Sequence, residues 1–365
     1  AKNIYVYNNT FIHCSVSWSW TENSHFYNNT VTDFGRGYSV NANRNNLYVY
    51  IHDNVVTGAG NAAFKIYSSS YQYVYNNIVD GAQKGFYLGI APKHVDLYNN
   101  TVKGCTMAGI WIETQSLTTN ITVRNNLIYD NNCPGIKTYT YPPGNPDSNA
   151  NIINNVLYKN TDGILLSSPD ITIKISNNII TNNSGYGINN ENGDISFIGY
   201  NDVWNNAGGD YNGISPGTGD ISEDPLFADP VNHDFHLKST AGRWNSTDWV
   251  YDDVTSPCID AGDPSEKDPD GTRINMGAYG GTWEASKSPS AATGTLTGTV
   301  TNTTGAPIEE ALIKANSHQT TTNSTGGYTI TLPAGNYTLT ASKTGYQSAT
   351  SSATVNEGAT TTVNF

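Results

Sequence analysis

The chain has 365 residues, of which 13% are charged, and its 31 acidic and 18 basic residues give a net charge of −13. This balance argues against nucleic-acid binding, which needs a basic surface. No apolar stretch approaches the ~18 residues that span a bilayer, so we expect no transmembrane segment and no signal peptide. The abundance of Tyr, Gly, Asn and Thr favours strands joined by tight turns and argues against an ordinary α/β enzyme.

A short motif with a central Asn pair recurs along the first 204 residues. It reads IYVYNNTF at 4–11, VDLYNNTV at 95–102 and IKISNNII at 173–180, and successive copies are about 24 residues apart. Each copy has an alternating strand, the Asn pair, a second short strand and often a Gly-led third strand, such as GIWIE at 109–113. Asn tolerates the left-handed conformation of a turn, and stacked Asn side chains can bond from coil to coil. Three strands per repeat predict an all-β fold, a parallel β-helix of about nine coils over residues 1–213.

These residues resemble right-handed parallel β-helix repeat proteins of the pectate-lyase-like superfold. Residues 214–284 are acidic, and DPLFADP at 224–230 and SPCIDAGDP at 256–264 resemble the closing module that follows many surface β-helices. Residues 285–293 read as a flexible linker. Residues 294–365 resemble a carboxypeptidase regulatory-like (prealbumin-type) β-sandwich. Such modules are common on archaeal and bacterial surfaces, so the resemblance implies an extracellular or cell-surface location.

Strand alternation sends one set of residues in each first strand outward, and most of them are tyrosines. Stacked coil on coil, they predict an outward tyrosine ladder made of Tyr5, Tyr7, Tyr27, Tyr50, Tyr73, Tyr75 and Tyr98. Cross-strand aromatic pairs stabilise a sheet by ~0.2–1 kcal/mol each, which alone could account for the ladder. Contiguous exposed aromatics also mark interaction sites. We therefore favour a platform for cell-surface glycans or for another subunit.

The third strands form the face to test for catalysis. One outward column is predicted to contain Ser39, Lys65, Tyr87, Trp111 and Lys137. A polysaccharide lyase of the pectate or alginate type needs a base for the proton beside a uronate carboxylate, and a cation or amide for the enolate. Lys65, Lys137 and Glu113 of the next column are the candidates for these roles, with the Tyr87 and Trp111 rings beside them. Ordinary solvated strand residues are the simpler interpretation, because the sequence lacks the carboxylate clusters of known β-helix enzymes.

Acidic residues of the closing module could hold Ca²⁺, which takes about six to eight oxygens. The candidates are Asp260, Asp263, Asp268 and Asp270. Solvated acidity explains them as well, because the segment lacks the last acid of an EF-hand. His233 and His236 have metal-site spacing without a third ligand, so we interpret them as structural.

Two kinds of covalent modification are suggested by the sequence. Cys105 and Cys133 lie on successive coils and are candidates for a disulfide. The N-x-S/T sequons, which are candidate glycosylation sites, are at Asn8, Asn28, Asn99, Asn120, Asn182, Asn245, Asn302, Asn323 and Asn336.

The sequence starts directly in a coil, with Ile4, Val6 and Phe11 already in the repeat, and an open β-helix end needs a cover. We therefore predict that copies of the chain stack head to tail into a filament or sheath. A structural or adhesive surface protein of this kind ranks first. A glycan-binding module and a polysaccharide lyase are the alternatives, since fold alone does not decide function.

Overall fold

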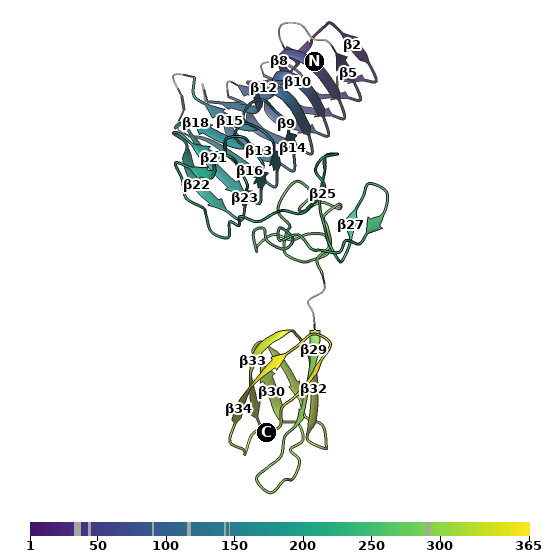
Figure 1. Cartoon of the computed structure of the whole chain (residues 1–365). Helices are drawn as coiled ribbons and strands as arrows, with labels where there is room; N and C mark the ends of the chain where they lie inside the picture. Colours follow the sequence, from purple (N-terminus) through teal and green to yellow (C-terminus); the bar gives the residue numbers. More distant parts are fainter. Residues whose placement is uncertain are drawn as a thin grey trace. The chain divides into compact units, whose positions relative to one another are not determined.

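The computed structural model describes residues 1–32, 38–42, 45–89, 91–114, 118–141, 144–145, 147–289 and 293–365. It forms two compact units, Ala1–Ser288 and Pro289–Phe365, and each is described by itself (Figure 1). The linker predicted at 285–293 lies partly outside the described residues. In the described part of the chain, no helix is long and apolar enough to span a membrane.

The first unit is built on a parallel β-helix, whose strands stack one above another in chain order (Figure 1). Its first sheet takes one strand from each coil and has nine parallel strands. They are β1 (Tyr5–Tyr7), β4 (Glu22–Tyr27), β7 (Leu47–His52), β9 (Ser70–Tyr75), β11 (Lys93–Tyr98), β13 (Thr119–Arg124), β16 (Ser148–Ile153), β19 (Ile171–Ser176) and β22 (Asp194–Gly199). Inward side chains such as Phe26, Ile51 and Leu97 form the core between the faces of the coil. The predicted β-helix is confirmed.

The second sheet follows each Asn pair. Its strands are β2 (Thr10–Ile12), β5 (Thr30–Thr32), β8 (Val55–Tyr67), β10 (Ile78–Gly89), β12 (Thr101–Glu113), β14 (Leu127–Tyr129), β17 (Val156–Tyr158), β20 (Ile179–Thr181) and β23 (Asp202–Trp204). The third face adds β3 (Val16–Trp18), β6 (Tyr38–Ala42), β15 (Ile136–Tyr139), β18 (Ile164–Ser167), β21 (Tyr186–Asn190) and β24 (Gly209–Asn212). In β8, β10 and β12 one long strand serves both faces, because Gly58, Gly81 and Gly104 bend it at φ values of 70°, 83° and 69°.

The two residues of each Asn pair have different tasks. The first turns the chain in the left-handed region, as at Asn76 (φ 55°) and Asn99 (φ 53°). The second forms a ladder of side-chain hydrogen bonds between coils, which confirms the predicted Asn stacking, and it is buried in every coil after the first. The members of this ladder are Asn9, Asn29, Asn54, Asn77, Asn100, Asn126, Asn155, Asn178 and Asn201.

The ladder described above and a second, shorter Asn ladder of the rod each end on an aspartate. Asp220 Oδ1 accepts hydrogen bonds from Asn201 N at 2.7 Å and from Asn201 Nδ2 at 3.0 Å. A second ladder, at the bend into the third face, ends where Asp210 Oδ1 accepts from Asn206 Nδ2 at 3.0 Å; its members are Asn131, Asn160, Asn183 and Asn206. A carboxylate accepts hydrogen bonds without donating any. Each aspartate therefore accepts from the N–H groups of the last Asn and needs no acceptor from a further coil.

The acidic segment first extends the rod and then packs along its side. Thr218 and Ile221 pair with Gly199 and Asp202 of the last coil. The short hairpins that follow are β25 (Phe227–Asp229) with β26 (Asp234–Leu237), and β27 (Arg243–Trp244) with β28 (Trp249–Val250). Their core unites Phe227, Phe235 and Met276 with the rod residues Tyr129, Val156, Tyr158 and Ile179. The sequence placed this module at the end of the rod; its lateral packing explains why β17 is buried on both faces.

The second unit is a β-sandwich, as predicted. One sheet has the order β32 (Gly327–Pro333), β29 (Thr293–Thr299), β35 (Thr360–Thr362). The other has the order β31 (His318–Thr321), β30 (Leu312–Ala315), β33 (Gly335–Ser342), β34 (Ala349–Val355). Apolar side chains such as Leu296, Leu332 and Leu339 fill the space between the two sheets.

Candidate functional site

Four of the predicted third-face residues lie side by side on adjacent strands. The strand register places Lys65 of β8 beside Tyr87 of β10, and continues through Trp111 of β12 to Lys137 of β15. Asn41, and not Ser39, is the partner of Lys65. The prediction for Ser39, which is buried, is therefore wrong, because the number of residues between the Asn pair and the third strand differs from coil to coil.

Tyr87 and Glu113 form a covered pair on this face. Their exposed fractions are only 8% and 9%, so the prediction that both point into solvent is wrong. The Tyr87 hydroxyl donates a hydrogen bond of 2.9 Å to Glu113 Oε1. Glu113 is thus a hydrogen-bonded carboxylate beneath the surface, positioned by its neighbour on the preceding coil.

Lys84 belongs to the same face, although strand alternation does not predict it there. Its Nζ lies 5.1 Å from the centre of the Tyr87 ring and 4.9 Å from that of Trp111. The β10 register shifts between Ala82 and Lys84, which breaks the alternation used to assign faces. Burial lowers the pKa of the Lys84 ammonium, and the nearby Glu113 carboxylate offsets part of this effect.

The other two lysines flank the same rings. Lys65 Nζ is 4.2 Å from the ring centre of Tyr67 and 5.8 Å from that of Tyr87. Lys137 Nζ is 5.1 Å from the centre of the Trp111 ring. We call this set the lysine–aromatic face; its members are Lys65, Lys84, Lys137, Tyr87, Trp111 and Glu113.

The chemistry of the lysine–aromatic face is cationic. Three ammonium groups lie within cation–π range of aromatic rings, whereas the one carboxylate of the set is hydrogen-bonded to Tyr87. Trp111 Nε1 is buried and has no hydrogen-bond partner among the described residues. The face can therefore offer an anionic ligand several positive charges, with the partly exposed Trp111 ring between them.

The predicted tyrosine ladder resolves into parallel stacks, in which histidines fill the gaps. One stack runs Tyr5, His25, Tyr50, Tyr73, with ring centres 4.9, 4.5 and 5.1 Å apart. Another runs Tyr7, Tyr27, His52, Tyr75, Tyr98, with ring centres 5.0, 5.0, 4.7 and 4.9 Å apart. A third stack, which was not predicted, runs Tyr48, Tyr71, His94.

These stacks leave little room for a ligand between the rings. Neighbouring rings are nearly parallel, with 6° between Tyr27 and His52 and 3° between His52 and Tyr75. The faces of the inner rings are therefore occupied by other rings, and a sugar would meet mainly ring edges. The guanidinium of Arg124, 4.2 Å from the ring centre of Tyr98, ends the longer stack. The geometry supports a stabilising role for the ladder more than a sugar platform.

The candidate calcium ligands hold the loops of the acidic module. Asp268 accepts from the backbone N–H groups of Asn275 and Gly281, and burial raises its pKa to about 6. Asp263 and Asp270 accept from Ser265 and Thr272, and Asp260 accepts from Ser288. Across the described ranges, no group of three or more His, Cys, Asp or Glu side chains could hold a metal ion.

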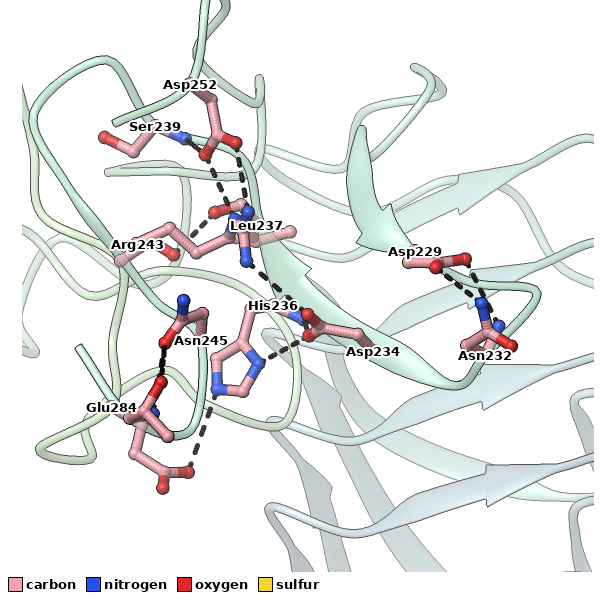
Figure 2. A network of polar contacts seen from close by, with 12 residues as sticks. Asp229, Asn232, Asp234, His236, Leu237, Ser239, Arg243, Asn245, Asp252 and Glu284 are labelled. Atoms are coloured by element: carbon pink, nitrogen blue, oxygen red, sulfur yellow. Dashed lines mark hydrogen bonds and ion pairs between the residues drawn. The ribbon is translucent and has the colours of Figure 1, made fainter. Parts of the chain in front are cut away.

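The two histidines of the module have different surroundings. His233 Nε2 lies 2.9 Å from Asp130 Oδ2, and its ring stacks on Tyr129 at 4.4 Å, so it joins the module to the rod. His236 is buried in a network of charged groups shown in Figure 2. Its Nδ1 lies 2.6 Å from Asp234 Oδ1.

The predicted disulfide is not formed, because Cys105 and Cys133 are both buried free thiols in the structure. Burial raises the pKa of both thiols, that of Cys133 to about 12. Most sequon asparagines are exposed, and Asn182 and Asn302 are half-buried. Glycosylation at these positions stays a prediction.

Comparisons with known families match three segments of the chain. Residues 1–145 match the family described as right handed beta helix region, residues 92–262 match disaggregatase related, and residues 295–365 match carboxypeptidase regulatory-like domain. A search of curated proteins gave no match. The β-helix and disaggregatase-related segments indicate a surface or carbohydrate-related β-helix protein. The fold and the matches together show a right-handed parallel β-helix protein with a C-terminal carboxypeptidase regulatory-like domain.

Proposed function

We propose that this chain is an extracellular surface protein whose β-helix binds an acidic polysaccharide along the lysine–aromatic face. The observation that carries the proposal is the grouping of Lys65, Lys84 and Lys137 around the Tyr87 and Trp111 rings. Carboxylate or sulfate groups of the polysaccharide would pair with the ammonium groups. The C–H face of a sugar ring would pack on the exposed part of the Trp111 ring.

Local charge is what makes an anionic ligand compatible with an acidic protein. The net charge of −13 would repel a polyanion at long range, but about 8 Å of screening at physiological salt limits this repulsion. Along the rod, Lys65 and Lys137 are separated by three strand steps, or roughly 14 Å. A polysaccharide could therefore engage several lysines at once, each contributing a modest energy.

The test measures binding of polygalacturonate and of alginate to the chain and to the triple variant Lys65→Ala, Lys84→Ala, Lys137→Ala. A control variant with the same charge change combines Lys2→Ala, Lys93→Ala and Lys314→Ala. We expect the first variant to lose at least tenfold in affinity and the control to lose less than threefold. If both variants lost affinity equally, the loss would come from the change in net charge, and the proposed site would be wrong.

A polysaccharide lyase is the second candidate function, favoured by the lowered pKa of Lys84. A neutral Lys84 amine would take the proton beside a uronate carboxylate. The electrons of that C–H bond would form a C=C bond while the bond to the glycosidic oxygen breaks, and the leaving oxygen would take a proton from solvent. Activity should rise with pH through a pKa below the 10.5 usual for lysine, and Lys84→Ala should abolish the unsaturated product's ultraviolet absorbance.

Head-to-tail self-assembly and adhesion remain predictions. Negative-stain electron microscopy of the chain at increasing concentration tests assembly directly. Filaments whose repeat matches the length of one subunit would support it, and dispersed particles at the highest concentration would contradict it.

A further inference from the structure

A cleft of about 390 Å³ lies where the acidic module meets the turns of the rod. One wall is made by residues 278–284 of the module and the other by the turns of three coils, including Asn76, Asn99 and Asn125. Asn125 Nδ2 fixes the two walls together by donating to the carbonyl oxygens of Ala278 and Gly280, both at 2.9 Å. The volume falls within the range of about 300–1,000 Å³ typical of small-ligand sites.

The module wall presents an exposed indole. Trp283 is 65% exposed, and the Trp244 ring meets it at an interplanar angle of 67° with ring centres 5.2 Å apart. Trp244 is braced in the same way by Trp249. A large aromatic side chain is thus held in position at the cleft without being covered, which leaves apolar surface available to a ligand.

Glu284 gives this cleft a negative charge, because it is the only Asp, Glu, Lys or Arg among the described residues that line it. Its Oε2 lies 3.9 Å from His236 Nε2, too far for a hydrogen bond (Figure 2). His236 is only 5% exposed, and Nε2 has no hydrogen-bond partner within the described residues. Its ring also stacks on Tyr279, another lining residue, with centres 3.6 Å apart.

The network behind the cleft holds His236 in place. Arg243 forms two ion pairs, from Nη1 to Asp234 Oδ2 at 3.4 Å and from Nε to Asp252 Oδ2 at 3.0 Å. The Asp234 carboxylate that contacts His236 is therefore itself held in place. Burial opposes charge on His236, but Asp234 and Glu284 outweigh it and raise the histidine's pKa. Glu284 therefore lines the cleft next to a rigid group, with which its Oε2 forms a long ion pair of 3.9 Å.

We propose that this cleft binds a neutral or amino sugar. The Trp283 plane fits the C–H face of a pyranose, while Glu284 and the side-chain amides of Asn76 and Asn99 fit its hydroxyl or amino groups. Glu284 would repel a uronate or a sulfated sugar. The cleft thus has the opposite charge preference to the lysine–aromatic face, and the inference is independent of the function proposed for that face.

The test uses chain expressed without N-glycosylation, because Asn99 is itself a sequon and its own glycan would enter the cleft. The probes are tetrasaccharides of N-acetylglucosamine, of glucosamine and of galacturonate, titrated calorimetrically. We expect one or both of the first two to bind, with at least a tenfold loss in Trp283→Ala. Glu284→Gln should weaken glucosamine binding at least threefold.

Two controls separate this site from general effects. Tyr251→Ala removes another exposed aromatic side chain of the same module, one that is 74% exposed, and this variant should bind the probes as the unchanged chain does. The lysine triple variant should also keep cleft binding, so that failure of one proposal is distinguishable from failure of the other. Absence of binding of the first two probes at millimolar concentration, or unchanged binding by Trp283→Ala and Glu284→Gln, would overturn the inference.

Discussion

Replacing Asn100 tests whether the buried Asn ladder stabilises the rod. Asn100 is 1% exposed, and its Nδ2 donates to Val74 O, Tyr98 O and Asn126 Oδ1 at 2.9, 2.9 and 3.0 Å. Its Oδ1 accepts from both N and Nδ2 of Asn77 at 3.0 Å. One side chain therefore joins three coils.

The expected loss follows from these contacts. A hydrogen bond is worth about 0.5–1.5 kcal/mol net, and a buried group left without a partner costs about 1–3 kcal/mol. Asn100→Ala leaves the Asn77 N–H without its acceptor and removes the side-chain donor to the carbonyl oxygens of Val74 and Tyr98, so we expect the free energy of unfolding to fall by about 3–5 kcal/mol. Asn100→Asp should be at least as damaging at neutral pH, because an oxygen then faces the carbonyls of Val74 and Tyr98.

Urea unfolding of the first unit, followed by far-ultraviolet circular dichroism, measures these changes. Asn99→Gly is the matched control, since Asn99 is exposed with φ at 53° and glycine adopts that conformation freely; its cost should stay below about 1 kcal/mol. Asn100→Asp should recover part of its stability in mild acid, when the buried carboxyl becomes protonated. A loss below 1 kcal/mol in Asn100→Ala would refute the ladder's role.

Three other predictions concern buried groups. Burial raises the pKa of Asp202 from 3.8 to about 7. The folded state therefore binds this proton more tightly than the unfolded state, and the stability of the fold should fall as the pH rises from 4 to 7. Asp202→Asn should flatten this pH dependence and raise Tm at pH 8. A Cβ at Gly109 would lie 2.5 Å from Gly135 O, so Gly109→Ala should lower the unfolding free energy by about 1–3 kcal/mol, and an unchanged urea midpoint would contradict this packing. Of the four cysteines, only Cys14 is exposed; a thiol reagent should label one group in the native chain and four after unfolding, whereas two after unfolding would indicate a disulfide.

The repeat architecture was predictable because each coil repeats one simple pattern. The Asn pair marks the same turn in every coil, and alternation around it places residues such as Ile51 and Leu97 in the core. The last copy differs by one position: Tyr200 takes the left-handed turn and Asn201 enters the ladder. Further along, Asn205 takes a left-handed turn and Asp210 ends the second Asn ladder. The Asn pair alone predicts neither of these.

The candidate sites could be predicted only in part, because they depend on contacts between coils and on an irregular module. The bulge before Lys84 shifts its side chain onto the lysine–aromatic face, and no periodic pattern signals such a shift. Alternation predicts that Tyr87 and Glu113 are exposed, yet both are buried and hydrogen-bonded to each other across adjacent coils. The cleft at Trp283 was missed because it forms only when residues 278–284 pack on turns more than 150 positions earlier in the sequence.

The central claim is that an acidic polysaccharide binds the lysine–aromatic face, and lysine footprinting tests it most directly. The chain is acetylated briefly with and without a galacturonate oligosaccharide, and the modification of each lysine is measured by mass spectrometry. We predict that Lys65, Lys84 and Lys137 become protected while Lys93 and Lys314 react as before. Protection of other lysines instead, or of none at a saturating oligosaccharide concentration, would contradict the proposed function.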